Sequence, residues 1–347
     1  MDFVQGIEGD YLESKNDNLI FDVKGLLHPK ERKICFIRFY PHPDGDRSRD
    51  GLKYKKIYDL QARYSFLRKN FPKYLFFSNE RDLELQGVRI EDIKEIYTPR
   101  DYFKKLQTKH DLSNIENYSK DLCNLFINEC DISDTSIGIS GSPMVHLNKE
   151  DSDIDLIIYG TDTSLKFQEK LVKLFNTSVN LRKYNLEEFK NHFNWRAGGS
   201  NITFKEFLRS ERRKLHQGKY HDHDFFIRYI KSPEDWNHDF YDLIYENFGR
   251  VKIKAKISDS RESIFTPCSY KVESVKVLDS SKIKRTHDKV NLLEINSYRG
   301  RYCEQATKGE AVSVAGKLER VQVKNNDPYF RILLENPKMD YMVILDP

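Results

Sequence analysis

Long apolar runs are absent from this sequence of 347 residues. No segment approaches the length that spans a bilayer, and the opening residues, MDFVQGIEGD, lack the basic-then-apolar order of a signal peptide. We therefore expect a cytoplasmic protein with no membrane partner.

Cysteine is scarce, and its spacing lacks any metal-binding pattern. The five cysteines form no Cys-x-x-Cys motif and no cluster with histidine at the spacing of zinc ligands. Their odd number does not suit a complete disulfide framework. We expect buried or incidental thiols at Cys35, Cys123, Cys130, Cys268 and Cys303.

An excess of one charge is also missing. The 58 basic and 54 acidic residues leave a net charge of only +4. This balance neither requires nor excludes a nucleic-acid partner, so any basic surface must be local. With 22 Phe and 20 Tyr, the chain has enough aromatic residues to exclude a disordered protein.

The length predicts two or three domains, and the patterns suggest three. Residues 1–107 predict an α/β unit that could bind an acceptor substrate. Its strand-like runs are 19–23 and 34–40, helical spacing follows from Tyr58 to Leu67, and Thr98-Pro99 is a helix start signal.

Residues 108–248 predict the catalytic unit, a mixed α+β core. Apolar residues recur at helical spacing over 114–130 and 164–175. Between these helices, residues 154–159 are almost continuously apolar, which is typical of a strand buried on both faces.

Residues 249–347 predict a small β-barrel, with OB-like topology as the expected form. Apolar and polar residues alternate over 252–257 and 312–318. Further strand-like runs lie at 270–278, 292–295, 330–334 and 341–345.

The most specific motif lies at the head of the apolar strand. Gly141-Ser142 is followed, after ten intervening residues, by Asp153-Ile154-Asp155. Strand alternation puts both carboxylates on one face, where they repel one another and need a cation. Two such carboxylates with phosphate oxygens suit Mg²⁺. A glycine lets the backbone approach a phosphate closely, and a serine offers a hydroxyl and an N–H.

The acidic run 150–155 has a simpler explanation, in which it caps a strand and binds nothing. An Asp-x-Asp sequence alone would favour that explanation. The Gly-Ser pair at this distance, together with the buried strand, favours a nucleotide site instead.

This segment resembles the signature of the DNA polymerase β-like nucleotidyltransferase superfamily, in which Gly-Ser is followed by Asp-x-Asp. The string Ser152 to Leu156 carries the match. The whole chain resembles archaeal proteins that are predicted nucleotidyltransferases of unassigned substrate. The resemblance implies a polymerase β-like core, Gly141 and Ser142 on the triphosphate, and Asp153 and Asp155 on two Mg²⁺ ions. It also implies transfer of NMP from an NTP, with ATP the expected donor, and release of pyrophosphate (EC 2.7.7 type).

The superfamily pattern includes a third carboxylate on a neighbouring strand. Asp222 and Asp224 precede an apolar run, and an ideal strand would put them on one face. We predict Asp224, because it lies nearer the apolar part, as a metal ligand or general base. The alternative is a polar turn before the strand.

Two basic regions could contact phosphates. Arg209, Arg212 and Arg213 lie mostly on the outer side of a predicted amphipathic helix, and we predict that they bind nucleotide, although such a face is often only solvated. Basic residues also alternate with aromatic ones from Arg38 to Tyr58 and from Tyr298 to Tyr302. These stretches either stack bases and pair phosphates or form ordinary surface.

The acceptor is the least specified part of the hypothesis. The predicted barrel and the basic-aromatic stretches favour RNA, such as tRNA, as the acceptor and partner. A protein or small-molecule acceptor stays open, as does a non-catalytic RNA- or nucleotide-binding protein on the same fold. The sequence does not specify the oligomeric state.

Overall fold

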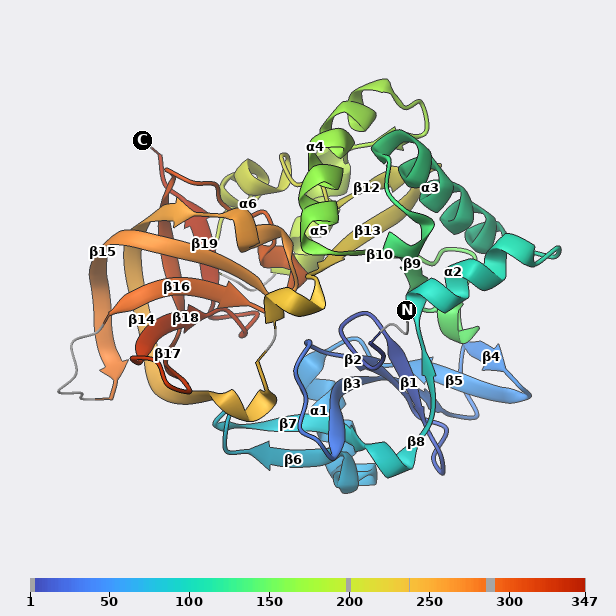
Figure 1. Ribbon diagram of the computed structural model, residues 1–347, viewed down its shortest axis with the longest axis horizontal. Coiled ribbons are helices and arrows are strands. Elements are labelled where there is room, and N and C mark those ends of the chain that lie inside the picture. The colour runs from blue at the N-terminus through green and yellow to red at the C-terminus, as the bar shows by residue number, and fades with distance from the viewer. Residues whose placement is uncertain (1–3, 198–200, 237, 285–290, 347) are drawn as a thin grey trace. The chain divides into compact units, whose positions relative to one another are not determined.

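The computed structural model describes residues 4–197, 201–236, 238–284 and 291–346. Over these residues the fold is mixed α+β, with three sheets and six α-helices (Figure 1). All five cysteines are buried and unbridged. None of the described helices is both long enough and apolar enough to cross a membrane.

The N-terminal sheet contains eight strands and carries its core on one face. Its main path runs β4-β5-β3-β2-β1-β8, and β7 joins β3 to β6. Leu12, Phe21 and Ile37 are fully buried, together with Leu67 of the helix α1. The bounds are β1 Tyr11–Ser14, β2 Ile20–Val23, β3 Arg32–Pro41, β4 Arg47–Arg49, β5 Leu52–Lys56, α1 Leu60–Asn70, β6 Leu75–Ser78, β7 Leu83–Arg89 and β8 Ile93–Tyr97.

The opposite face of the N-terminal sheet is polar. Because side chains alternate along a strand, Tyr11 and Asp22 point away from the core face, and these two residues are register partners. Asp22 is nevertheless buried, as is Glu8 just before β1. This face is therefore covered by other parts of the chain.

The central sheet has five strands in the order β11-β12-β13-β10-β9. The strand β10 is parallel to β13 and antiparallel to β9. Figure 1 shows α3 and α4 beside one another over this sheet, and α2 packs on β9. The bounds are α2 Pro99–Thr108, α3 Asn114–Cys130, β9 Ile137–Ser140, β10 Ile154–Tyr159, α4 Thr161–Thr177, β11 Leu181–Arg182, β12 Gln217–Tyr220 and β13 His223–Ile230.

The two faces of β10 have different neighbours. Ile154 and Ile158 pair with Phe225 and Tyr229 of β13, on the face where aromatic rings of α3 and α4 pack. On the other face, Ile157 packs against Ile7 of the N-terminal segment. The prediction of a strand buried on both faces is confirmed.

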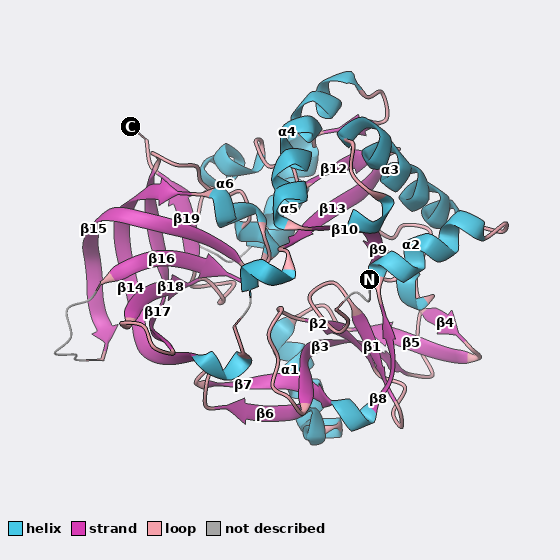
Figure 2. Ribbon diagram, viewed as in Figure 1, coloured by secondary structure: helices cyan, strands magenta, loops and turns pink. Residues whose placement is uncertain are grey.

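The third sheet has six strands, five of which close a ring. Pairing runs β14-β15-β16-β18-β17, and β17 pairs again with β14, while β19 pairs with β17 outside the ring. Figure 2 shows the long strands β14 and β15 curving together. We call these strands the C-terminal barrel. The bounds are β14 Leu243–Asp259, β15 Cys268–Ile283, β16 Leu292–Ser297, β17 Ala311–Val323, β18 Tyr329–Leu333 and β19 Tyr341–Ile344.

The chain forms two compact units, and neither is one continuous segment. Unit 1 holds the N-terminal and central sheets, and unit 2 holds the C-terminal barrel with residues 79–82 and 183–216. Residues 183–216 form α5 (Leu186–Ala197) and α6 (Phe204–Glu211). The sequence-based boundary at 107 lies at the end of α2, and the boundary at 248 lies within β14. The predicted central segment also includes α5 and α6, which this grouping places in unit 2.

The aromatic packing under the central sheet generates a stability prediction. Phe167 of α4 is fully buried, with its ring centroid 5.1 Å from Phe126 and 6.1 Å from Tyr229. We expect Phe167→Ala to lower the free energy of unfolding by about 3–5 kcal/mol through lost contacts and a cavity. Val172→Ala, on the exposed side of the same helix, should stay within about 0.5 kcal/mol of wild type. Urea unfolding of both variants measures the difference, and equal losses would contradict this packing.

Candidate active site

A glycine brings the backbone against the carboxylate of Asp155. Gly141 follows β9 with φ +80°, and Asp155 on β10 is the register partner of Ser140. A Cβ atom at position 141 would lie 2.5 Å from Oδ2 of Asp155. Only a residue without a side chain fits this approach in this backbone conformation.

Hydrogen bonds of Ser142 and Ser152 close the loop between the Gly-Ser pair and the Asp-x-Asp sequence. The Ser142 hydroxyl donates to Oγ of Ser152 at 3.3 Å, and Ser152 also accepts from the backbone N–H of Lys149 at 2.8 Å. The backbone N–H of Leu147 donates to the Ser142 carbonyl at 2.9 Å. The ten residues between Ser142 and Asp153 therefore turn back, and the Gly-Ser pair lies beside the Asp-x-Asp sequence.

The two acids differ in exposure. Asp153 is exposed just before β10, whereas Asp155 is half-buried within it. Strand alternation gives both side chains the same face of the central sheet. This face also carries Phe226 and Arg228 of β13, which pair with Asp155 and Ile157.

The N-terminal sheet is joined to the same loop by charged side chains. Arg47 donates to the carbonyl of Leu147, and Lys149 forms an ion pair with Asp46. All four residues belong to unit 1. The N-terminal sheet is thus part of the candidate site rather than a separate module.

A small polar cavity lies beneath the acid pair, between the two sheets of unit 1. Its volume is about 70 Å³, and it is lined by Tyr11, Asp22, Arg38, Ser140, Asp155, Leu156, Ile157, Phe226 and Arg228. Pockets for drug-sized ligands measure roughly 300–1,000 Å³. A nucleoside therefore cannot enter this cavity, and a nucleotide would have to bind on the open side, toward Ser142 and Asp153.

Opposite charges balance one another around the cavity. Lys24 forms ion pairs with Asp22 at 2.7 Å and Glu8 at 3.3 Å, and Arg228 pairs with Glu8 at 2.8 Å. Burial opposes ionisation of Asp22, but Lys24, Arg228 and Arg38 outweigh it and lower its pKa. Burial and the neighbouring Asp22 raise the pKa of Tyr11 to about 12, so its hydroxyl stays protonated.

Asp222, the alternative third carboxylate, lies in a tight turn. His221 and Asp222 both have positive φ, and Tyr220 pairs with His223 across them, as in a two-residue hairpin. Asp222 is exposed and pairs with Arg182 at 2.9 Å. The expectation that Asp222 and Asp224 share a strand face is wrong, because Asp222 is outside the strand.

Asp224 lies within β13 on the same face as Phe226, two residues before it. Its carboxylate forms an ion pair with Lys219 at 3.1 Å. Across the described parts of the chain, no group of three or more His, Cys, Asp or Glu side chains is arranged to hold a metal ion. The structure therefore does not gather Asp153, Asp155 and Asp224 into one ready-made metal group.

Two carboxylates on one strand face still suit a magnesium ion. Mg²⁺ is usually bound through one or two carboxylates, with substrate phosphates and water completing its shell. Asp153 and Asp155 match that donor set, and the backbone of Gly141 lies close against the carboxylate of Asp155.

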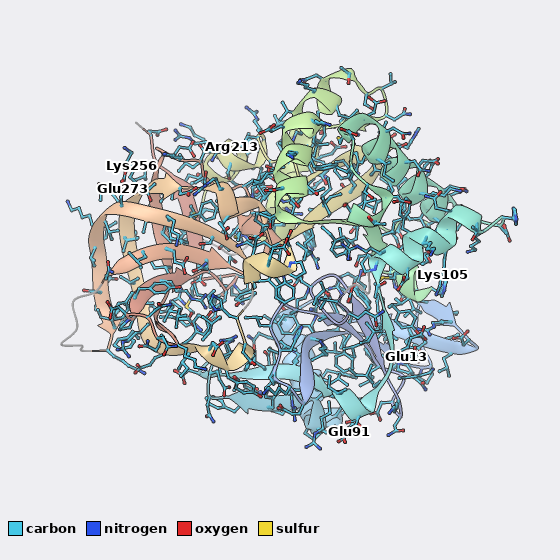
Figure 3. The ribbon with its side chains drawn as sticks, viewed as in Figure 1. Glu13, Glu91, Lys105, Arg213, Lys256 and Glu273 are labelled. Carbon is cyan, nitrogen blue, oxygen red and sulfur yellow. The ribbon has the colours of Figure 1, made fainter. Side chains whose placement is uncertain are left out.

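The predicted nucleotide-binding arginines belong to unit 2. Arg209 pairs with Asp346 at 2.6 Å. Arg213, labelled in Figure 3, donates to both oxygens of Glu310 at 2.7 and 2.8 Å, while Arg212 is exposed. Two of these three charges are balanced inside unit 2, so their assignment to the nucleotide stays a prediction without support from the geometry.

Sequence reasoning did not single out the cations that do lie near the acid pair. Arg38 lines the cavity with Asp155, and the field of both acids reaches Lys56. The basic-aromatic alternation from Arg38 to Tyr58 was the available signal. It could not separate these two side chains from the exposed lysines around them.

Comparison with known proteins gives a relative but no activity. No family model matches the chain, and no solved structure matches it. The chain is 26% identical over 334 residues to a protein of Methanocaldococcus jannaschii that is itself described as uncharacterized. The match covers 94% of each protein, so it extends through both units.

The close approach of Gly141 to Asp155 predicts a specific sensitivity. Gly141→Ala should cost about 1–2 kcal/mol for its left-handed backbone, and a further ~1 kcal/mol because Asp155 must leave its rotamer. Gly51→Ala is a matched control, because Gly51 has φ +78° with nothing within 4 Å of an added Cβ. Unfolding free energies and Mg²⁺ affinities of both variants test this. Equal effects in the two would contradict the contact.

Proposed function

We propose that this protein is a metal-dependent nucleotidyltransferase whose active site is built from Gly141, Ser142, Asp153 and Asp155. One observation carries the proposal: the glycine backbone lies against the carboxylate of Asp155, while Ser142 is hydrogen-bonded to Ser152 beside Asp153. A phosphate site and a paired carboxylate site are then adjacent, which is what phosphoryl-group chemistry requires.

Each residue has a defined part in the proposed reaction. Asp153 and Asp155 would hold Mg²⁺, which when bound activates the acceptor oxygen and neutralises charge on the triphosphate. Ser142 and the backbone at Gly141 would orient the phosphates. The acceptor hydroxyl forms a bond to the α-phosphorus as the bond to the pyrophosphate breaks. Its proton passes to a base, for which Asp224 is the candidate.

An RNA acceptor is the favoured substrate class. The ring order β14-β15-β16-β18-β17, with β16 and β18 parallel, supports an OB-type five-stranded barrel. Barrels of that type bind oligonucleotides on the face of their second and third strands. In this chain those strands are β15 and β16, where Val277, Leu278 and Leu293 are exposed. Lys252, Lys254 and Lys256 alternate along the outer side of the neighbouring β14.

The rival function is a non-catalytic protein that binds RNA or nucleotide on the same fold. Two carboxylates separated by one residue favour the enzyme, because acids brought together on a metal site need a cation between them. Simple binding of a nucleotide does not require that pair.

Incubation of the full chain with Mg²⁺ and each labelled NTP, with cellular RNA or protein added, tests the proposal. We expect label in RNA and release of pyrophosphate. Labelled protein would move the acceptor to another class, and no label with any NTP or acceptor would favour the non-catalytic rival.

The acid pair generates the next prediction. Asp153→Asn and Asp155→Asn should each reduce transfer by at least about 100-fold, the scale seen when one electrostatic contact to a transition state is lost. Their thermal stability should stay close to wild type, because removing one charge relieves repulsion. Asp151→Asn, an exposed acid of the same run, should keep full activity. Wild-type turnover in either variant would show that the substituted acid does not belong to the active site.

Ser142 can be tested against its own hydrogen-bond partner. Losing a hydrogen bond to a charged phosphate costs about 1.5–3 kcal/mol, so Ser142→Ala should weaken NTP binding roughly 10- to 150-fold. Ser152→Ala breaks the same serine pair without touching the phosphate. Titration of both variants with Mg²⁺-NTP separates the roles, since equal losses would mean that Ser142 only closes the loop.

A further inference from the structure

Lys56, the last residue of β5, carries an ammonium group with unusual surroundings. Its Nζ lies 4.9 Å from the ring centroid of Tyr58 and 5.8 Å from that of Phe39. Among the described residues no carboxylate forms an ion pair with it, and no acceptor takes a hydrogen bond from it. Lys56 is half-buried, and the neighbouring side chain of Tyr58, which is 64% exposed, forms an open edge of the protein beside it.

The acid pair is part of the same electrostatic environment. Burial and repulsion by Arg38 lower the pKa of Lys56 to about 8, while attraction to Asp155 and Asp153 opposes this decrease. Contacts also connect Lys56 to the loop that precedes the acids. Lys56 is the register partner of Phe39, and the guanidinium of Arg47 lies 5.5 Å from the centroid of the Phe39 ring. Arg47 in turn donates to the carbonyl of Leu147 in that loop.

Arg38 of β3 is a second cation on this side of the site. It lines the cavity together with Asp155 and Tyr11. Its Nε is buried and has no hydrogen-bond partner. Within the described chain, no carboxylate is in ion-pair contact with its guanidinium.

Two cations held together near a protein surface repel one another and lose solvation. Buried charges are normally paired, and the exceptions concentrate at functional sites, where a ligand completes the balance. Burial opposes the charge of Arg38, but Tyr11, Asp22 and Asp155 outweigh it and raise its pKa. Of the two, Lys56 is therefore the cation that, among the described residues, has no carboxylate in ion-pair contact and also has a lowered pKa. An anionic ligand at the open edge would complete the charge balance.

We propose that Lys56 of the N-terminal sheet binds the phosphate chain of the nucleotide beside the Asp153–Asp155 pair. This inference rests on the proposed function. It assigns phosphate recognition to β5 of unit 1, in place of Arg209, Arg212 and Arg213. Lys56 is a binding residue at the site entrance.

Inorganic tripolyphosphate with Mg²⁺ is the probe, because it lacks base and sugar. With the full chain, calorimetric titration should show Lys56→Met binding tripolyphosphate about 10- to 150-fold more weakly than wild type. Lys56→Arg should restore most of the affinity, which a purely structural change would not do. Lys53→Met is the matched control, since it removes the same charge from an exposed position on the same strand and should bind as wild type does.

Amine labelling with mass spectrometry gives a second measurement that needs no variant. Tripolyphosphate with Mg²⁺ should protect Lys56 in the wild-type chain from acetylation and leave Lys53 unprotected. Wild-type binding with no protection of Lys56, or with equal affinity in Lys56→Met, overturns this inference while the proposed function stands. A wild-type chain that binds neither tripolyphosphate nor any NTP overturns both.

Discussion

The fixed position of Asp155 in one buried strand is the constraint on which the site depends. Asp155 lies within β10, which is fixed between β9 and β13 with apolar neighbours on both sides, and Asp153 comes directly before this strand. Asp155 cannot move far without moving the centre of the sheet. Glycine at 141 and the Ser142–Ser152 hydrogen bond place a side-chain-free backbone next to the two acids.

The charge on the other side of the site comes from a different sheet. The polar face of the N-terminal sheet contributes Asp22, Lys24 and Arg38, and Glu8 joins it to Arg228 of the central sheet. Removing one member of a buried ion pair typically costs 3–5 kcal/mol, about as much as losing a large core side chain. These contacts therefore help to explain why two sheets with separate apolar cores form one compact unit.

Much of the fold could be predicted from local signals. The helix over 114–130 was fully specified, because Ser113 and Glu116 form a capping box and the apolar face is continuous. The N-cap at Thr98 and the strands of the barrel were equally clear. The turn at His221 and Asp222 was only the alternative to a strand, because two non-glycine residues with positive φ give no strong sequence signal. No local signal predicted that α5 and α6 form one unit with the barrel, since this grouping depends on contacts between residues far apart in the chain.

The path of the chain between units also constrains how the protein can be made. After β11 the chain leaves unit 1 to form α5 and α6, and it returns at Gln217 to supply β12 and β13. During synthesis these helices emerge before any strand of the barrel with which they form unit 2. At that stage β10 has been made, but its parallel neighbour β13 has not. Apolar surface of the two helices and of β10 is therefore exposed on the nascent chain at the same time. Such a chain is more vulnerable to aggregation than one whose domains fold in order, and it should depend more on slow synthesis or on chaperones.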